Sequence, residues 1–326
     1  MRQPGAMQWI KGLLVPDRLR LRVTAGPAGA RAVSLLYQQR RYQALASSAR
    51  RMRSLALSHG IGPRCGPPIA AFDELCELVG VEPLGAAAIQ SGAADRLVVC
   101  IVGHPASVVV KVGALVDSGL ATESVMLSKL EGTAGPVMVP RVRWHGPWRA
   151  HLVLATEALE AINRHRDLTL DEAADTATAL CAGMATVGPL VHGDLSPWNV
   201  LRTVDGLTLV DWEEGRVAYE PLFDLAHFVI TCAALLEHRP ADSAVSLLTS
   251  PGSPGWQHLA ALKVDPSTAP ELLLDYLERT RDYEKTRRYR AAVLQALDGI
   301  SLNGRRYPTS AEAAGAQPQS RKAEPR

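Results

Sequence analysis

Two carboxylates and an amide stand at fixed spacing in residues 191–215, VHGDLSPWNVLRTVDGLTLVDWEEG. Asp194 and Asn199 come before a short apolar run, and Asp211 ends a second one. Val-Asp-Gly at 204–206 separates the runs, and Asp-Gly between apolar residues predicts a β-hairpin because the turn needs positive φ. Such a hairpin would bring the three polar side chains together at its open end. Oxygen ligands of this kind suit a Mg²⁺ ion that also binds phosphates. One of the two carboxylates would then not be needed as a ligand.

The same segment resembles the catalytic loop and metal-binding aspartate of kinases. The matching positions are His192, Asp194, Leu195, Asn199 and Asp211. Pro197 before Asn199, and the Trp-Glu pair after Asp211, make the segment similar to the aminoglycoside phosphotransferase and choline kinase-like family. The protein-kinase branch is a poorer match.

The resemblance implies an α+β, bilobal protein kinase-like fold. Its small lobe would hold an antiparallel sheet plus a helix, and its large lobe would be mainly helical with a catalytic hairpin. Asp194 would be the base, Asn199 and Asp211 would hold Mg²⁺, and His192 would scaffold the loop. Asp224, in an Asp-Leu-Ala that follows the metal loop, would support the backbone of the catalytic loop. The implied cofactors are ATP or GTP and Mg²⁺.

Lys111 follows three valines on a predicted buried strand, and a buried ammonium needs a partner because an unpaired buried charge is costly. Glu123, in a helix-like run at 121–130, is the candidate partner. By the resemblance, this pair would hold the α- and β-phosphates of the nucleotide. Ser91 and Gly92 occupy the turn expected over the phosphates, which lacks a full glycine-rich pattern.

The small lobe is expected at residues 68–156. Alternating β-branched residues bounded by Gly and Pro predict its strands. Their ranges are 84–89, 96–102, 107–112, 137–144 and 151–155, the last two joined at Gly146-Pro147. The hinge to the large lobe would follow at 156–159. In the resembling family main-chain groups of the hinge bind adenine, which makes Glu157 and Leu159 candidates.

Residues 1–67 carry twelve Lys and Arg side chains against the single acid Asp17. We expect a basic, largely helical N-terminal extension outside the small lobe, with a helix over 29–59. Two interpretations stay open. The helix could be an accessory packed on the lobe with its arginines in water. Alternatively, residues 18–64 could contact an anionic surface or a partner.

The large lobe, with the acceptor site, is expected at residues 157–306. A capping pattern at Thr169 and Glu172 begins its first helix. Further helices are predicted at 228–236, 271–279 and 283–297. Acids and bases balance in this region, so the acceptor site shows no acidic excess that would favour polycationic aminoglycosides. Residues 307–326 have the composition of a disordered tail.

The whole chain has 326 residues, a net charge of +2 and five scattered cysteines. These features favour a cytoplasmic protein with reduced thiols and no nucleic-acid partner. No stretch approaches the roughly 18 apolar residues that a membrane-spanning helix needs, so we expect no transmembrane segment. The expected partner is a small-molecule alcohol.

We therefore expect an enzyme, an ATP-dependent O-phosphotransferase acting on a hydroxyl of a sugar, amino alcohol or aminoglycoside-like acceptor. The alternative is a nucleotide-binding pseudokinase or scaffold that uses the basic N-terminal arm. A protein kinase is disfavoured, because residues 212–220 contain no Ser or Thr that could be phosphorylated.

Overall fold

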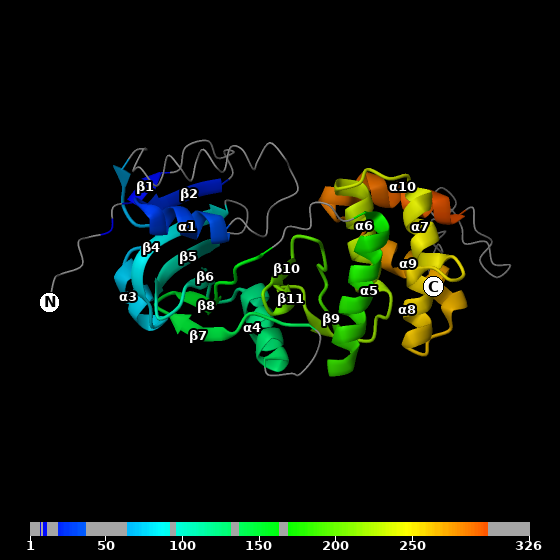
Figure 1. Cartoon of the computed structure of the whole chain (residues 1–326), viewed down its shortest axis with the longest axis horizontal. Helices are drawn as coiled ribbons and strands as arrows, with labels where there is room; N and C mark the ends of the chain where they lie inside the picture. Colours follow the sequence, from blue (N-terminus) through cyan, green and yellow to red (C-terminus); the bar gives the residue numbers. More distant parts are fainter. Residues whose placement is uncertain are drawn as a thin grey trace, which may run out of the picture.

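A computed structural model describes residues 7, 9–11, 19–36, 64–91, 96–131, 137–162 and 169–298. Within these ranges, one part of the molecule is an eight-stranded antiparallel sheet, on the left in Figure 1. The strand order is β3-β1-β2-β4-β5-β6-β8-β7. The strands are β1 (Trp9–Lys11), β2 (Leu19–Thr24), β3 (Arg64–Cys65), β4 (Glu82–Ser91), β5 (Leu97–His104), β6 (Val108–Ala114), β7 (Val142–Trp148) and β8 (His151–Glu157).

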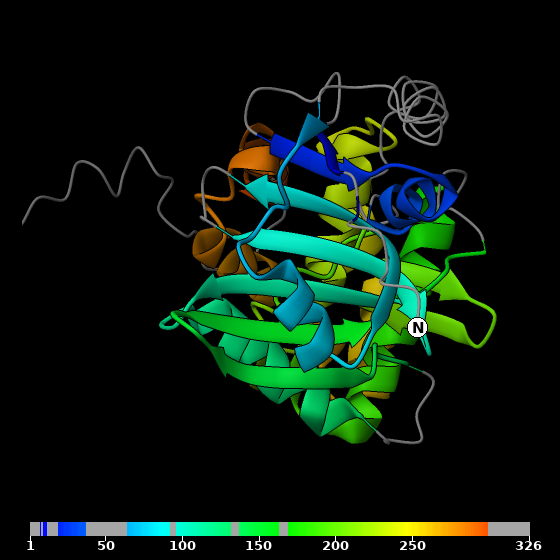
Figure 2. The ribbon, with the colours of Figure 1, turned by 90° about the vertical axis from the view of Figure 1, so that its left-hand side faces the viewer.

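Both faces of this sheet are buried, because alternate residues of β4 and β5 contribute to two different hydrophobic clusters. Ala86 and Val99 pack on the side of α3 (Phe72–Leu78), which lies in front of the strands in Figure 2. Ala87 and Cys100 pack with α1 (Pro27–Leu36) on the other side. A third helix, α4 (Ser118–Leu130), contacts β7 and β8.

The N-terminal region departs from expectation, because β1, β2 and β3 belong to the same sheet as β4 to β8. Leu21 of β2 pairs with Ile89 of β4 and is 1% exposed. The boundary expected between residues 67 and 68 therefore divides a single sheet. The helix expected over 29–59 is described only as α1, and residues 37–63 lie outside the described ranges.

The turn expected at Gly146-Pro147 is also corrected, since both residues lie inside β7. The chain turns instead at Arg149, whose φ is 53°. β7 is the last strand in the sheet order, and an edge strand tolerates proline because no neighbouring strand needs its missing N–H.

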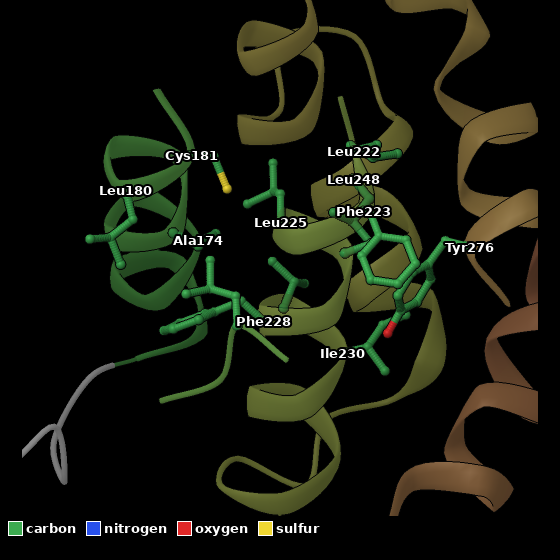
Figure 3. Close-up of a cluster of buried hydrophobic side chains, with 14 of the residues drawn as sticks. Ala174, Leu180, Cys181, Leu222, Phe223, Leu225, Phe228, Ile230, Leu248 and Tyr276 are labelled. Carbon is green, nitrogen blue, oxygen red and sulfur yellow. The ribbon is translucent and has the colours of Figure 1, made fainter. Parts of the chain in front are cut away.

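The other part of the molecule is mainly helical and is built around α6. Its helices are α5 (Leu170–Val187), α6 (Phe223–Leu235), α7 (Ala241–Thr249), α8 (Pro254–Ala261), α9 (Ala269–Arg279) and α10 (Arg287–Asp298), with short turns η3 (Pro266–Thr268) and η4 (Glu284–Thr286). Eleven consecutive residues of α6, from Phe223 to Ala233, are buried. Figure 3 shows Leu225 and Phe228 of α6 facing α5, and Phe223 beside Tyr276 of α9.

Two small antiparallel pairs complete the helical part. β10 (Val200–Thr203) pairs with β11 (Gly206–Leu209), and β9 (Leu190–Val191) pairs with β12 (Arg216–Val217). In Figure 1, β10 and β11 lie between the large sheet and the helices. The expected α+β, bilobal arrangement, with a sheet-plus-helix small lobe and a helical large lobe carrying a hairpin, is thus confirmed.

No helix in the described ranges is both long and apolar enough to cross a membrane. The tail expected at 307–326 lies outside those ranges.

Candidate active site

The predicted hairpin brings its polar ends together. Val200 pairs with Leu209 and Thr203 with Gly206, whose φ of 136° allows the tight turn. At the open end, the Val210 N–H donates to the Asn199 carbonyl over 3.0 Å. Asp194, Asn199 and Asp211 all line one cavity of about 520 Å³ between the two lobes.

Lys111 of β6 reaches into this cavity and contacts three carboxylates. Its ammonium donates to Glu123 of α4 over 2.7 Å, as the sequence predicted. It also donates to Asp211 over 2.6 Å and to Glu213 over 3.0 Å. The lysine therefore joins the small-lobe helix to the residue that follows the large-lobe hairpin.

The three carboxylates determine the electrostatics of this cluster. Burial alone would lower the pKa of Lys111, but Asp211, Glu123 and Glu213 outweigh it, so the pKa lies well above its usual value. The lysine is therefore charged at any physiological pH. Burial raises the pKa of Glu123, and the negative charges of Asp211 and Glu213 add to this rise, although Lys111 opposes it.

Residues at this cluster could also hold a divalent cation. One oxygen from each of Glu123, Asp211 and Glu213 lies within 4.8 Å of the others. Carboxylate oxygens are the ligands that Mg²⁺ prefers. Asn199 uses its Nδ2 to donate to the Asp194 carbonyl at 2.8 Å and to Asp194 Oδ2 at 3.2 Å. Its Oδ1 is then the amide atom suited to a cation. The donor set fits the expected ion.

Asp194 is held by groups from three parts of the large lobe. The Tyr283 hydroxyl donates to Oδ1 over 3.1 Å, and His227 Nε2 of α6 lies 3.0 Å from the same oxygen. Asn199 donates to Oδ2. Burial would raise the pKa of Asp194, but the contact with His227 and nearby positive groups outweigh it, so its pKa lies below the usual value. The carboxylate is ionised and fixed in place.

The backbone of the catalytic loop is anchored by Asp224. Its Oδ2 accepts the N–H of His192 at 2.7 Å, and its Oδ1 accepts that of Gly193 at 3.0 Å. Gly193 has a φ of 85°, and a Cβ there would lie 2.4 Å from the Glu214 carbonyl oxygen, so glycine is required. Burial raises the pKa of Asp224 to about 6.

His192 joins the catalytic loop to the end of the hairpin. The residue is 0% exposed, its ring centre lies 4.5 Å from that of Trp212 at a tilt of 43°, and its Nε2 lies 3.1 Å from the Val210 carbonyl. Burial lowers its pKa to about 4, so the ring is neutral at pH 7 and its Nε2–H donates to that carbonyl.

The other end of the cavity is apolar and meets the expected hinge. Val98 and Val109 line it from the sheet, and Leu201 and Val210 line it from the hairpin. Leu35 and Leu36 of α1, from the N-terminal region, also line it.

Glu157 and Leu159 also line the cavity, and their binding of adenine stays a prediction. The Glu157 side chain is 2.6 Å from Arg143, and its N–H donates to the Arg141 carbonyl. The Ala158 N–H donates to the Ser107 carbonyl over 2.9 Å. Leu159, in contrast, donates its N–H to no acceptor among the described residues, which leaves that group available to a ligand.

Two predicted nucleotide residues are not placed at the site. Ser91 ends β4 and its side chain is not described, and Gly92 lies outside the described ranges. The phosphate loop therefore stays a prediction.

Several site residues were missed from the sequence. They are Glu213 and Arg96 beside Lys111, His227 and Tyr283 beside Asp194, and Lys285 at the cavity wall. Arg96 donates to both Asp117 oxygens at 2.5 Å and also to Glu213. Glu213 could have been suggested by its place two residues after Asp211. The others lie far from the motif in sequence, and only the fold brings them to it.

No protein-family model matches the chain, and no curated protein matches it in sequence. Its solved structural neighbours include a thermostable mutant of aminoglycoside phosphotransferase APH(4)-Ia with ADP and hygromycin B, at 13% identity and TM-score 0.46, covering 70% of this chain and 98% of that one. Another is described as a fructosamine-3-kinase from Haemophilus somnus, at 14% identity and TM-score 0.43, covering 70% and 95%.

A third neighbour is the PknI kinase domain from Mycobacterium tuberculosis, at 15% identity and TM-score 0.36, covering 64% of this chain and 92% of that one. Similarities at this level carry no functional inference, so the function is argued from the residues of the site.

Proposed function

We propose that this chain is an ATP-dependent O-phosphotransferase that transfers the γ-phosphoryl group to a hydroxyl of a small molecule. The observation that carries the proposal is the meeting of Lys111, Glu123 and Asp211 in the cavity that also holds Asp194 and Asn199. Phosphoryl transfer needs a cation at the phosphates, ligands for Mg²⁺ and a carboxylate at the attacking hydroxyl. This cavity offers all three.

The shape of the cavity is consistent with a bound nucleotide. Its apolar end, between Val98 and Val109 on one side and Leu201 on the other, suits a flat purine ring. The N–H of Leu159 would bind the ring edge. Lys111 and the carboxylates lie at the charged end, where the phosphates would be. A nucleoside triphosphate would thus lie with its γ-phosphate toward Asp194.

In the transfer, the hydroxyl oxygen of the acceptor bonds to the γ-phosphorus. The bond from phosphorus to the β–γ bridging oxygen breaks, and its electron pair leaves on ADP. Asp194 orients the hydroxyl and receives its proton as the new bond forms. Since its pKa lies below the usual value, Asp194 mainly positions the hydroxyl until late in the transfer.

Asn199 and Asp211 would hold Mg²⁺, with Glu213 as a neighbouring carboxylate. When bound, the ion supplies positive charge that offsets the charge on the phosphates. Lys111 would bind the α- and β-phosphates, and Glu123 would keep the lysine at that position by its ion pair. His192 and Asp224 fix the loop that carries Asp194 and touch no reacting atom.

The test is transfer of labelled γ-phosphate from ATP to a panel of sugars, amino alcohols, aminoglycosides and hydroxy acids. Asp194→Asn should reduce turnover at least about 10²-fold, a typical contribution of a positioned base, and Asp211→Asn should also reduce it strongly by removing a ligand of Mg²⁺. Asp205→Asn, in the exposed hairpin turn, is the matched control and should retain turnover. Full turnover in both site variants would refute the mechanism.

A further inference from the structure

One cation of the cavity has no carboxylate partner. Three Lys or Arg side chains line it: Lys111, Arg96 and Lys285. Lys111 contacts three carboxylates, and Arg96 contacts Asp117 and Glu213. Among the residues that the structure describes, Lys285 has no carboxylate within ion-pair distance. Its charge is therefore available to a ligand.

Lys285 lies next to Tyr283, the tyrosine that donates to the proposed base. It belongs to η4, and its Nζ is 5.5 Å from the centre of the Trp198 ring and 5.8 Å from that of Tyr283. Tyr283 itself donates to Asp194. The positive charge of Lys285 also contributes to the lowered pKa values of Asp194 and His227.

The carboxylates of the cavity are, in contrast, already engaged. Glu123, Asp211 and Glu213 contact Lys111, and Glu157 contacts Arg143. Asp194 accepts hydrogen bonds from Tyr283 and Asn199, lies 3.0 Å from His227, and in the proposed mechanism faces the hydroxyl. Among the described residues that line the cavity, none offers a cationic acceptor a free carboxylate, and Lys285 would repel such an acceptor.

We propose that the acceptor alcohol carries an anionic group, a carboxylate or phosphate, which Lys285 binds while the hydroxyl faces Asp194. This inference rests on the proposed phosphotransferase function and narrows it. Charge-assisted hydrogen bonds from an ammonium to an anionic oxygen are stronger than neutral ones, so one lysine suffices to select the sign of the charge. The rings of Trp198 and Tyr283 would flank the carbon chain between the two groups.

The experiment compares three alcohols of one carbon skeleton: glycerate, neutral glycerol and cationic 3-amino-1,2-propanediol. Their dissociation constants are measured by calorimetry with the full chain saturated with Mg²⁺ and AMP-PNP. Glycerate should bind at least tenfold more tightly than the amine. Lys285→Glu should reverse this order. Lys129→Glu, which makes the same charge change at an exposed position of α4, should preserve the original order of affinities.

Two results would overturn the proposal. In the first, the unmodified chain binds glycerate no more tightly than the amine, or does not bind it. In the second, Lys285→Glu keeps the original order of affinities.

A second experiment measures the affinities of the nucleotides ADP and AMP-PNP alone. Lys285→Glu should leave the ratio of their affinities unchanged. If the substitution weakened the binding of AMP-PNP only, Lys285 would be assigned to the γ-phosphate and its role toward the acceptor would be overturned. Absence of any Mg²⁺-dependent nucleotide binding would instead count against the proposed function itself.

Discussion

Asp194 is placed by contacts that do not depend on substrate. Its Oδ1 faces Tyr283 and His227, and its Oδ2 faces Asn199. His227 is itself buried, and the Tyr276 hydroxyl lies 3.3 Å from its Nδ1. Burial lowers the pKa of His227 despite the nearby carboxylate, so the ring is neutral at pH 7. Asp194 is therefore oriented by two neutral donors, Tyr283 and Asn199, and stays ionised.

The buried His192 ring predicts a pH dependence of stability. Its pKa is about 4 in the folded chain against 6.5 for an unperturbed histidine. The unfolded chain therefore binds a proton between pH 6.5 and 4 that the folded chain does not. The contribution of this neutral ring to the free energy of unfolding is fully present above pH 6.5 and is lost as the pH falls toward 4.

In His192→Gln, which keeps a donor for the Val210 carbonyl, this contribution disappears. From pH 7 to pH 5, denaturant unfolding should show the original chain losing about 2 kcal/mol more free energy of unfolding than the variant. Equal losses in the two proteins would mean that the ring is already protonated, or accessible, in the folded state.

Of the individual site residues, the sequence predicted those that belong to the catalytic-loop motif and the lysine–glutamate pair. Asp194, Asn199 and Asp211 share the cavity, and Lys111 pairs with Glu123. Tyr283 could not be predicted, because it lies 89 residues from Asp194 and reaches it only through the packing of the helices. The absence of a carboxylate partner for Lys285 among the described residues likewise follows from the fold and could not be predicted.

Among the elements, the hairpin was predictable because its turn chemistry is local. Val-Asp-Gly predicted the turn, and the structure pairs the flanking strands from Thr203 and Gly206 outward. The first helix of the large lobe was likewise marked by its capping box at Thr169 and Glu172. β7 was misjudged because Gly-Pro usually signals a turn, whereas an edge strand can include it.

The N-terminal strands were missed for a different reason. The strongly basic composition of residues 1–67 obscures the alternation in LRLRVT at 19–24, where Leu21 and Val23 are buried. Residues 9–11 and 19–36 thus belong to the body of the small lobe, and Leu35 and Leu36 reach the cavity. An accessory role for this part of the chain is no longer tenable.

A pair of matched substitutions tests this correction. Leu21→Ala, at a 1% exposed site, should lower the free energy of unfolding by about 2–5 kcal/mol through loss of burial and a cavity. Leu84→Ala, at a site 54% exposed on β4, should change it by less than about 0.5 kcal/mol. Denaturant unfolding measures both. Small, equal changes would place Leu21 outside the cooperative core.

Taken as a whole, the molecule places its chemistry where the two lobes meet. Lys111 and Glu123 come from the small lobe, and Asp194, Asn199 and Asp211 come from the large lobe. The ion pair between Lys111 and Asp211 crosses between them. A ligand with phosphates and Mg²⁺ would compete for both partners of this pair, so nucleotide and metal should bind together.

The most direct test of this account is calorimetric titration of the full chain with ATP, with and without Mg²⁺. Lys111→Met removes the ammonium and keeps much of the side-chain volume, and Lys129→Met serves as its control on the exposed face of α4. We expect ATP to bind far more tightly with Mg²⁺, and Lys111→Met to weaken that binding at least tenfold while Lys129→Met does not. A folded chain that binds ATP equally with and without Mg²⁺, or not at all, would contradict the phosphotransferase assignment.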